Sequence, residues 1–343
     1  MIYPPKPKPG DRVAIVSPSA GLPAIFPKVY ELGLRRLRDE IGLEPVEYPT
    51  TRVMGAPPAD RAADLNAAFA DPGVTAVMAS IGGDDQITVL RHLDAELIGA
   101  NPKPFFGYSD NTNLLSYLFG LGIVGYHGGS VLVRLGRGGR PHPSHITSLR
   151  EALFQPGWHE LTPPDEWGDE PGDWSDPTLL DTEPPMWPNE GWVWQNADRV
   201  VDGPGWGGNL EIISWLLAAG RIGPSEAFAG HVLFVETSEE MPSATEVYRI
   251  LRNMGERGLL EQFPAVLVGR AKAWERGHQN SPEQKREYTA QQRGAVERAL
   301  AEYNPDAVAV FDVDIGHTDP QLIVPYGGTI RVDGPNRQVT VRY

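Results

Sequence analysis

The sequence predicts an α/β protein built from two domains, and three observations support this prediction. The 343 residues exceed the usual size of a single domain, which is about 100–200 residues. Apolar strand-like segments alternate with amphipathic helix-like segments through the first half, a pattern typical of a parallel sheet covered by helices. A second alternating series begins after residue 200 and ends in a β-rich tail. We therefore expect an N-terminal parallel-sheet domain and a C-terminal α/β domain.

The first half is predicted to alternate strands with helices. Each predicted strand is an apolar run that ends at a turn, and each predicted helix has apolar residues at helical spacing. The expected strands cover residues 13–16, 75–81, 104–108 and 123–126. The expected helices cover residues 26–41, 62–69, 85–97 and 112–119. Because ligands of such sheets bind beyond the carboxyl ends of the strands, a site is expected in the turns that follow them.

Residues 161–200 differ from both halves and are expected to form a linker or insertion between domains at 1–160 and 201–343. The segment is rich in Pro, Asp and Glu, yet it contains five of the nine tryptophans of the chain. A disordered acidic linker is normally poor in aromatic residues, whereas a long ordered loop is often functional. The rings either pack the insertion onto the body or contact a ligand. These residues are Trp167, Trp174, Trp187, Trp192 and Trp194.

The second half is expected to begin with a glycine-rich turn at residues 203–208, followed by a helix at 209–219. Further apolar runs predict strands, and two longer segments between them predict helices. The expected strands cover residues 232–235, 265–268, 308–313, 329–332 and 339–341. The expected helices cover residues 244–254 and 284–303.

Composition excludes several classes of protein. The chain has no cysteine, which excludes thiol catalysis, disulfides and cysteine metal sites. Its formal net charge of -15 disfavours binding to nucleic acid or to anionic membrane surfaces. No apolar signal core and no apolar run of membrane length is present, so we expect a cytoplasmic protein.

The sharpest local feature is Ser109, between a predicted strand and a predicted helix. Gly107 lies two residues before it, as in the turn that exposes a nucleophilic serine above a sheet. The following helix N-terminus would point backbone N–H groups at the place where an oxyanion forms. The second glycine of the usual motif is replaced by Asn111. Ser109 is also a preferred type of residue for a helix N-cap, so this motif alone leaves both interpretations open.

A nucleophilic serine needs a base and a group that orients the base. His317 follows the predicted strand 308–313 in a turn with Gly and Pro, and His127 is its rival at another strand end. Glu236 ends the apolar strand 232–235, where a carboxylate is costly unless it is paired. Its neighbours Glu239 and Glu240 are interpreted as ordinary solvated acids. Ser109, Glu236 and His317 make a coherent relay, but their spacing in the sequence does not bring them together.

Two other chemistries are weaker. The segment 203–208 matches the G-x-G-x-x-G dinucleotide pattern, and Glu236 would then bind a ribose, although the preceding strand is thin and the spacing is long. Metal binding is disfavoured because the chain has neither an H-E-x-x-H motif nor cysteine. We therefore expect no metal and no cofactor.

Six short motifs, taken in order, resemble the LD-carboxypeptidase family, which includes the microcin C immunity peptidases. They are Ser17-Pro18-Ser19, Ser80-Ile81-Gly82-Gly83, Gly107-Tyr108-Ser109-Asp110, Gly207-Gly208-Asn209-Leu210, Leu233-Phe234-Val235-Glu236 and His317-Thr318-Asp319-Pro320. The resemblance spans nearly the whole chain. It implies a nucleophile elbow on the N-terminal domain, a C-terminal domain of swivelling β/β/α type, and a homodimer.

The resemblance also implies roles for individual residues. Ser109 is the expected nucleophile, His317 the expected base and acid, and Glu236 the residue that orients His317. The oxyanion hole is expected at the backbone N–H groups of Gly83 and Asp110. The residues expected to bind substrate are Gly82, Asp84, Asn209, Glu240, Trp187 and Trp192.

Within the family, the tryptophan-rich insertion resembles the immunity branch more than the muropeptide branch. Members of the immunity branch detach an aminoacyl or peptidyl group from a nucleotide-like amine, and Trp187, Trp192 or Trp194 is expected to stack on the base. Glu240 stands where the microcin C enzyme has a lysine that is thought to meet a phosphate. We therefore expect a substrate with a neutral or cationic group there. A muropeptide carboxypeptidase and a catalytically silent ligand-binding relative remain as alternatives.

Overall fold

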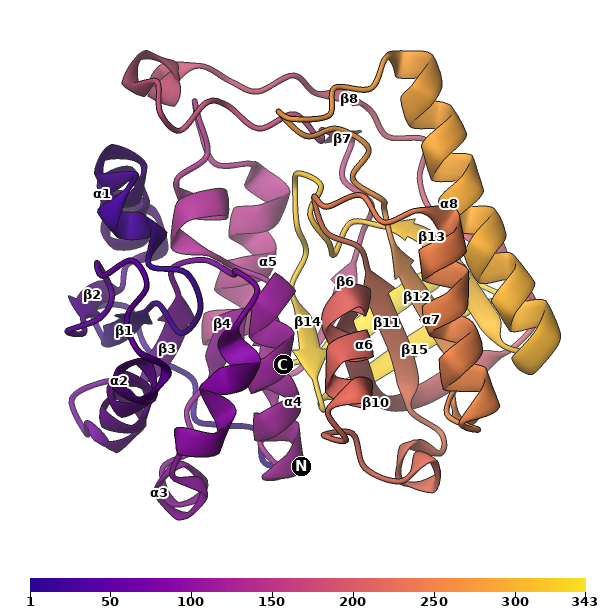
Figure 1. Ribbon diagram of the computed structural model, residues 1–343, viewed down its shortest axis with the longest axis horizontal. Helices are drawn as coiled ribbons and strands as arrows, with labels where there is room; N and C mark the ends of the chain where they lie inside the picture. Colours follow the sequence, from indigo (N-terminus) through magenta and orange to yellow (C-terminus); the bar gives the residue numbers. More distant parts are fainter.

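Two β-sheets with helices packed against them organise the molecule, one in each half of the chain (Figure 1). The computed structural model describes residues 1–343, except for the side chain of Leu179. The first sheet has the strand order β14-β5-β4-β3-β1-β2. Its strands are β1 (Arg12–Val16), β2 (Glu44–Glu47), β3 (Ala76–Ala79), β4 (Phe105–Gly107), β5 (Gly125–His127) and β14 (Val324–Tyr326).

The first five strands run parallel, as the alternating pattern predicts. The central strands β1 and β3 are almost entirely buried, which explains why their sequences are continuous apolar runs. Strand β2 lies at the edge and is largely polar, so the apolar pattern does not reveal it. The helices of this half are α1 (Pro27–Arg36), α2 (Pro58–Ala70), α3 (Ala95–Ala100), α4 (Thr112–Gly120) and α5 (Pro143–Phe154).

The prediction of one helix across residues 85–97 is wrong. The chain forms short 3₁₀ turns at Gln86–Thr88 and Leu90–His92, and α3 begins only after Asp94, whose side chain caps the Leu97 N–H. The fully buried Gln86 amide binds the Asn111 side chain and the Leu114 N–H, both just behind Ser109. These tertiary hydrogen bonds override the local helical pattern.

The second sheet has the order β6-β16-β15-β10-β11-β12-β13-β9, and its centre, β10 to β13, is parallel. Its strands are β6 (Trp158–Leu161), β9 (Val193–Gln195), β10 (Val200–Asn209), β11 (Val232–Glu236), β12 (Ala265–Gly269), β13 (Val308–Val313), β15 (Thr329–Asp333) and β16 (Gln338–Arg342). Its helices are α6 (Leu210–Ala218), α7 (Ala244–Glu256) and α8 (Pro282–Tyr303). The predicted α/β fold class is confirmed.

The prediction of a glycine-rich turn at residues 203–208 is wrong, because the segment belongs to the ten-residue strand β10. A Cβ atom on Gly207 would lie 1.8 Å from the carbonyl oxygen of Phe234, and one on Gly208 would lie 2.6 Å from Oγ1 of Thr112. Glycine therefore lets β10 approach both β11 and α4 closely. No phosphate-binding turn forms here, which contradicts the dinucleotide interpretation.

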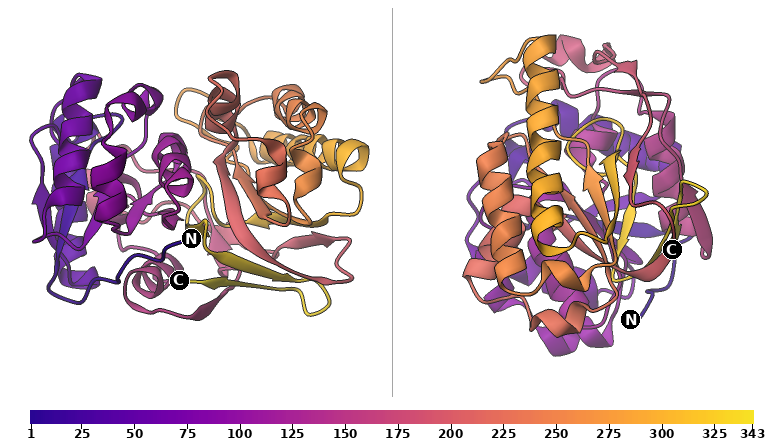
Figure 2. Two further views of the ribbon diagram at one scale, coloured as in Figure 1. Left: turned by 90° about the horizontal axis from the view of Figure 1, so that it is seen from below. Right: turned by 90° about the vertical axis from the view of Figure 1, so that its right-hand side faces the viewer.

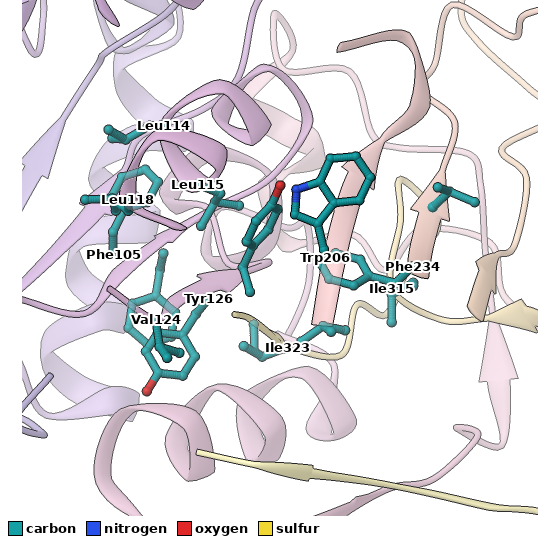
Figure 3. Close-up of a cluster of buried hydrophobic side chains, with 14 of the residues drawn as sticks. Phe105, Leu114, Leu115, Leu118, Val124, Tyr126, Trp206, Phe234, Ile315 and Ile323 are labelled. Atoms are coloured by element: carbon teal, nitrogen blue, oxygen red, sulfur yellow. The ribbon is translucent and has the colours of Figure 1, made fainter. Parts of the chain in front are cut away.

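The two halves lie side by side (Figures 1 and 2) and exchange strands. Strand β14, from near the end of the chain, completes the first sheet by pairing antiparallel with β5. Strand β6 joins the second sheet beside β16. Apolar side chains of both halves form one continuous core, in which Phe105 and Tyr126 lie in the same cluster as Trp206 and Phe234 (Figure 3).

The tryptophan-rich insertion runs across the top of the molecule in Figure 1, from the N-terminal half to α8. It contains the two-stranded antiparallel sheet of β7 (Glu166–Trp167) and β8 (Trp187–Pro188) before β9 joins β13. The backbones of Gly168 and Asp319 exchange two hydrogen bonds of 2.7 Å. The insertion therefore lies against the loop that carries His317. Along the described part of the chain, no helix has both the length and the apolar character needed to span a membrane.

Candidate active site

Ser109 lies in a strained turn at the junction of β4 and α4. Its φ of 60° is in the left-handed region, which a non-glycine residue rarely adopts. A short 3₁₀ turn, Ser109–Asn111, leads directly into α4. A non-glycine residue in this backbone region is often found where a side chain is held for function. The geometry agrees with a nucleophile elbow, and Tyr108, which has no capping bond, is the N-cap instead of Ser109.

Two glycines give this turn its room. A Cβ on Gly107 would lie 2.9 Å from the side chain of Asn111, so only glycine allows the turn to close. A Cβ on Gly82 would lie 3.0 Å from Cβ and 3.1 Å from Oγ of Ser109. Gly82 therefore faces the serine directly, from the turn after β3.

The turn after β3 and the turn after β4 meet at Gly83 and Asp110. The N–H groups of these two residues are not used in the backbone hydrogen bonds of the turns around them. The Asp110 carboxyl is fully buried and points away, accepting from the Ser19 hydroxyl, from the Gln86 N–H at 2.9 Å and from the Asn113 amide at 2.7 Å. Burial raises the pKa of Asp110, and the hydrogen bonds from Ser19 and Gln86 oppose the rise. The Asp110 side chain thus supports the turn.

Glu236 ends β11 and is only 2% exposed. Gly316 and Gly269 make space for it, because a Cβ on Gly316 would lie 2.9 Å from Oε2 of Glu236, and one on Gly269 would lie 2.6 Å from its Cβ. Asn209 is its register partner on β10. Burial alone would raise the pKa of Glu236, but the adjacent His317 imidazole reverses this effect, and the pKa of Glu236 lies below its ordinary value.

His317 pairs with Glu236 across the C-terminal half. Its Nδ1 donates to Oε2 of Glu236 at 2.5 Å. Burial lowers the pKa of His317, but the carboxylates of Glu236 and Glu239 outweigh burial and raise the pKa above the ordinary value of 6.5. The Tyr108 ring, next to Ser109, packs edge-on against the imidazole at 5.0 Å between centroids. The hydrogen bond from Nδ1 to Glu236 fixes the imidazole with Nδ1 protonated and leaves Nε2 to act as the base.

One cavity of about 550 Å³ joins Ser109 to His317. Its wall combines the Ser109 turn, residues 133–138, two stretches of the insertion, and loops of the C-terminal half. Gly82 and Gly83 also line it. The cavity therefore lies between the two halves of the chain, and its size suits a small organic ligand.

Glu239 also lines this cavity, although no sequence pattern distinguishes it from its neighbours. Its Oε2 lies 3.2 Å from Nε2 of His317, while its side chain is 51% exposed. Glu240, the residue expected to face substrate, is exposed and does not line the cavity. Glu239 lies three residues after the end of β11, and only the path of the loop brings it close to His317.

The expected substrate-binding residues lie in different places. Asp84 is exposed beside the Gly82–Gly83 turn, outside the cavity lining. Asn209 is buried behind Glu236 and caps α6 through its Oδ1, which accepts from the Ile212 N–H at 3.0 Å. Of the residues expected to bind substrate, Gly82 alone lines the cavity.

The insertion contributes a different tryptophan to the cavity from those expected. Trp187 packs on Trp167 and under the Lys285 ammonium. Trp192 donates from Nε1 to the buried carboxylate of Asp314 at 2.9 Å. Trp174 lines the cavity and packs edge-on against Phe26 at 5.4 Å.

His127, the rival base, is fully buried and does not line the cavity. Its Nε2 lies 3.1 Å from the carbonyl oxygen of Ile315, and burial lowers its pKa to about 4. Among the described residues, no three acidic or histidine side chains gather in a group that could hold a metal ion.

Comparisons with known proteins show the family and the fold. The model of the LD-carboxypeptidase N-terminal domain matches residues 13–128, and that of the C-terminal domain matches residues 202–332. The chain is 24% identical over 290 residues to the microcin C7 self-immunity protein of Escherichia coli, which covers 82% of this chain and 78% of the relative. It is 26% identical over 326 residues to a protein of Bacillus subtilis named "Probable murein peptide carboxypeptidase", covering 93% of this chain and 87% of the relative.

A solved structure is also similar. The microcin C7 self-immunity protein in complex with aspartyl sulfamoyl adenosine has a TM-score of 0.84 and 23% identity, covering 100% of this chain and 99% of that one. This likeness shows the same fold. The family models together cover more than half of the chain, and the protein therefore belongs to the LD-carboxypeptidase family and is a serine-type peptidase or amide hydrolase.

Proposed function

We propose that the enzyme cleaves an amide bond in a small aminoacyl or peptidyl conjugate, with Ser109 as nucleophile, His317 as base and Glu236 as the residue that orients His317. One arrangement carries this proposal. Ser109, strained at φ 60°, lines the same cavity as His317, and Glu236 holds His317 Nδ1 at 2.5 Å. A nucleophile, a base and an orienting carboxylate are the parts that acyl transfer needs.

The reaction proceeds in two steps. Oγ of Ser109 attacks the carbonyl carbon while Nε2 of His317 takes its proton, and the N–H groups of Gly83 and Asp110 stabilise the oxyanion. His317 then gives that proton to the departing amine, which leaves an acyl ester on Ser109. Water, deprotonated by His317, attacks the ester and releases the acid, and the proton returns to Ser109.

The substrate class is supported by a relative and by the cavity. The similar microcin C7 self-immunity protein binds aspartyl sulfamoyl adenosine, an aminoacyl nucleoside analogue. Trp174 offers an aromatic face in the cavity, and such faces stack on nucleobases. We therefore favour an aminoacyl-nucleotide-like substrate and an immunity-type, detoxifying role.

A muropeptide L,D-carboxypeptidase is the second candidate, favoured by the similarity to the Bacillus subtilis protein across 93% of this chain. The cytoplasmic location and the homodimer implied by the family resemblance stay predictions.

The test incubates wild-type and Ser109→Ala enzyme with aspartyl sulfamoyl adenosine and with an L,D-tetrapeptide, and follows the products by mass spectrometry. We expect wild type to release aspartate and the sulfamoyl nucleoside, and Ser109→Ala to release neither. A serine-directed phosphonate should label wild type alone. Release of only the terminal D-amino acid would select the second candidate. Equal turnover by the Ser109→Ala variant would contradict the mechanism.

A further inference from the structure

The acids that line the cavity are almost all already paired. Asp169 and Glu170 each lie 2.6 Å from Lys285, and Asp173 lies 2.6 Å from Arg276. The remaining pairs are Asp319 with Arg137 at 2.5 Å and Glu239 with His317 at 3.2 Å. Two buried cations in the same wall, Lys272 and Arg134, are left without a carboxylate at hydrogen-bonding distance among the described residues.

Lys272 is the clearer of the two. It is 5% exposed, and its ammonium donates to the backbone carbonyl of Asp169 at 2.9 Å. The Asp169 carboxylate does not help, because it turns toward Lys285 and the Ala273 N–H. The nearest acid, Glu275, lies 3.8 Å from Nζ and accepts from the Arg276 N–H instead. An ammonium has three donors, so two remain for a ligand in the cavity.

Arg134 adds a second positive charge at the same wall. Its Nη2 donates to the Gly316 carbonyl at 2.8 Å, while its Nε is buried without an acceptor. Its nearest carboxylate, that of Asp319, lies 3.7 Å away and is already bound by Arg137. Both cations thus have a carboxylate within 4 Å but none at hydrogen-bonding distance. Burying a charge is costly unless it is closely paired and hydrogen-bonded, so an anion bound at this wall would be stabilised.

We propose that Lys272, assisted by Arg134, forms a subsite that binds a carboxylate of the substrate during the amide hydrolysis proposed above. The subsite lies in the cavity that Ser109 and His317 line, so a carboxylate bound there belongs to the same ligand that Ser109 attacks. The partner chemistry is an anion able to accept two hydrogen bonds, which a carboxylate does well. Burial lowers the pKa of Lys272, the acids Glu275 and Glu239 oppose this, and Arg134 adds to it. A substrate carboxylate at Nζ would favour the charged ammonium again.

This carboxylate has two possible sources. An acidic side chain on the acyl group would place it on one side of the bond, and the free terminus of the released residue would place it on the other. Two matched substrate pairs separate these sources: aspartyl against asparaginyl sulfamoyl adenosine, and an L,D-tetrapeptide against its C-terminal amide. Each pair differs only by a carboxylate and its uncharged isostere.

The first measurement is the ratio of kcat/KM within each pair for the wild-type enzyme. We expect one pair to favour the carboxylate by about 10- to 100-fold, the usual effect of a hydrogen bond to a charged group. The pair that shows the preference identifies the source. Ratios near one in both pairs would overturn the proposal without any variant being made.

The second measurement compares Lys272→Met with the matched control Arg276→Met. Both variants remove one positive charge from the cavity lining, but Arg276 is exposed and already paired with Asp173. Lys272→Met should bring the ratio close to one, Lys272→Arg should retain part of it, and Arg276→Met should change it by less than about threefold. An equal loss in both methionine variants would mean that the general charge of the cavity causes the preference, and would overturn the proposal.

A binding experiment separates this proposal from the proposed reaction. The Ser109→Ala variant, with and without Lys272→Met, is titrated calorimetrically with all four compounds. A carboxylate preference in Kd that requires Lys272 supports the subsite even if wild type hydrolyses none of the compounds. If wild type hydrolyses a pair but Kd and kcat/KM show no dependence on Lys272, the subsite is wrong and the proposed function stands. Absence of both binding and hydrolysis would overturn both.

Discussion

The carboxylate of Glu239 lies 3.2 Å from Nε2 of His317, the nitrogen that the proposed mechanism needs for Ser109. Glu236 holds the other nitrogen, so two carboxylates flank one imidazole. Glu239 is half exposed on the loop after β11, whereas Glu236 is buried. The Glu239 carboxylate is therefore free to move aside when substrate binds, whereas the Glu236 carboxylate is not.

This arrangement predicts a pH effect of Glu239→Gln. His317 must be neutral to act as base, so kcat/KM should rise with pH through the pKa of His317, which the two carboxylates raise above 6.5. Removing the Glu239 charge lowers that pKa and moves the acid limb to lower pH. The pH profile of kcat/KM measures this shift of the acid limb. Glu240→Gln, outside the cavity, is the control and should leave the limb in place; an unmoved limb in Glu239→Gln would contradict the assignment.

Glu236→Gln should reduce kcat by about 10⁴-fold, as expected when an orienting carboxylate is replaced by an amide that can hold the wrong imidazole tautomer. KM should change little, because Glu236 is buried behind His317 and does not line the cavity. Steady-state kinetics would check the split. A variant within tenfold of wild type would show that Glu236 does not orient the base.

The Glu236–His317 pair also predicts how stability depends on pH. Because the pKa of Glu236 is lowered in the folded state, its ionised carboxylate stabilises the protein above pH 4.5. This stabilisation is lost as the pH falls through the pKa that Glu236 has in the folded state. Because the pKa of His317 is raised in the folded state, its protonated imidazole stabilises the protein fully below pH 6.5. This stabilisation is lost as the pH rises through the pKa that His317 has in the folded state. The Tm difference between wild type and His317→Asn should therefore be larger near pH 5.5 than at pH 9. A difference that grows toward alkaline pH would have the wrong sign.

Gly82→Ala should reduce kcat, but by less than the about 10²-fold that a displacement of a reacting group by about 1 Å causes, because Ser109 would have to move by only a few tenths of an ångström. The new methyl group would lie 3.0 Å from Cβ of Ser109 and would push the serine out of line. Gly172→Ala is the matched control, since Gly172 also lines the cavity but has open space around its Cβ position. Kinetics and Tm for both variants would separate displacement from unfolding.

Trp174→Ala should weaken binding of an adenosine ligand by about 1–3 kcal/mol if the ring stacks on the base. Trp187→Ala is the comparison, because Trp187 packs against Trp167 and lies outside the cavity lining. Fluorescence or calorimetric titration of the Ser109→Ala background gives the affinities. A larger loss for Trp187→Ala would assign the stacking role to Trp187, one of the three tryptophans that the sequence suggested for it.

The sequence predicts those features that depend on local pattern. Buried parallel strands are continuous apolar runs, so β1, β3, β4 and β11 are apparent in the sequence. The polar residues just after β4 and at the end of β11 make Ser109 and Glu236 candidates. The glycine-rich sequence of β10 matches the sequence pattern of a phosphate-binding turn. Only the closeness of Phe234 and Thr112 shows why glycine is required there.

Features that depend on tertiary contacts are not visible in the sequence. Glu239 and Glu240 are adjacent and chemically identical, and the path of the loop alone decides which of them meets His317. Lys272 resembles any surface lysine until its burial and its single carbonyl acceptor are known. Among the tryptophans, the docking of the insertion on Asp319 and Asp314 determines that Trp174 faces the cavity and Trp192 does not.

The exchange of β14 has a consequence for how the enzyme is made. The sheet that carries Ser109 keeps an open edge at β5 until residues 324–326 have left the ribosome. Strand β6 likewise waits for its neighbour β16 at residues 338–342. The serine is synthesised more than 200 residues before the strand that closes its sheet. A nascent or truncated chain that lacks β14 therefore presents a serine turn on an incomplete sheet, and hydrolytic activity should appear only after residues 324–326 have been synthesised.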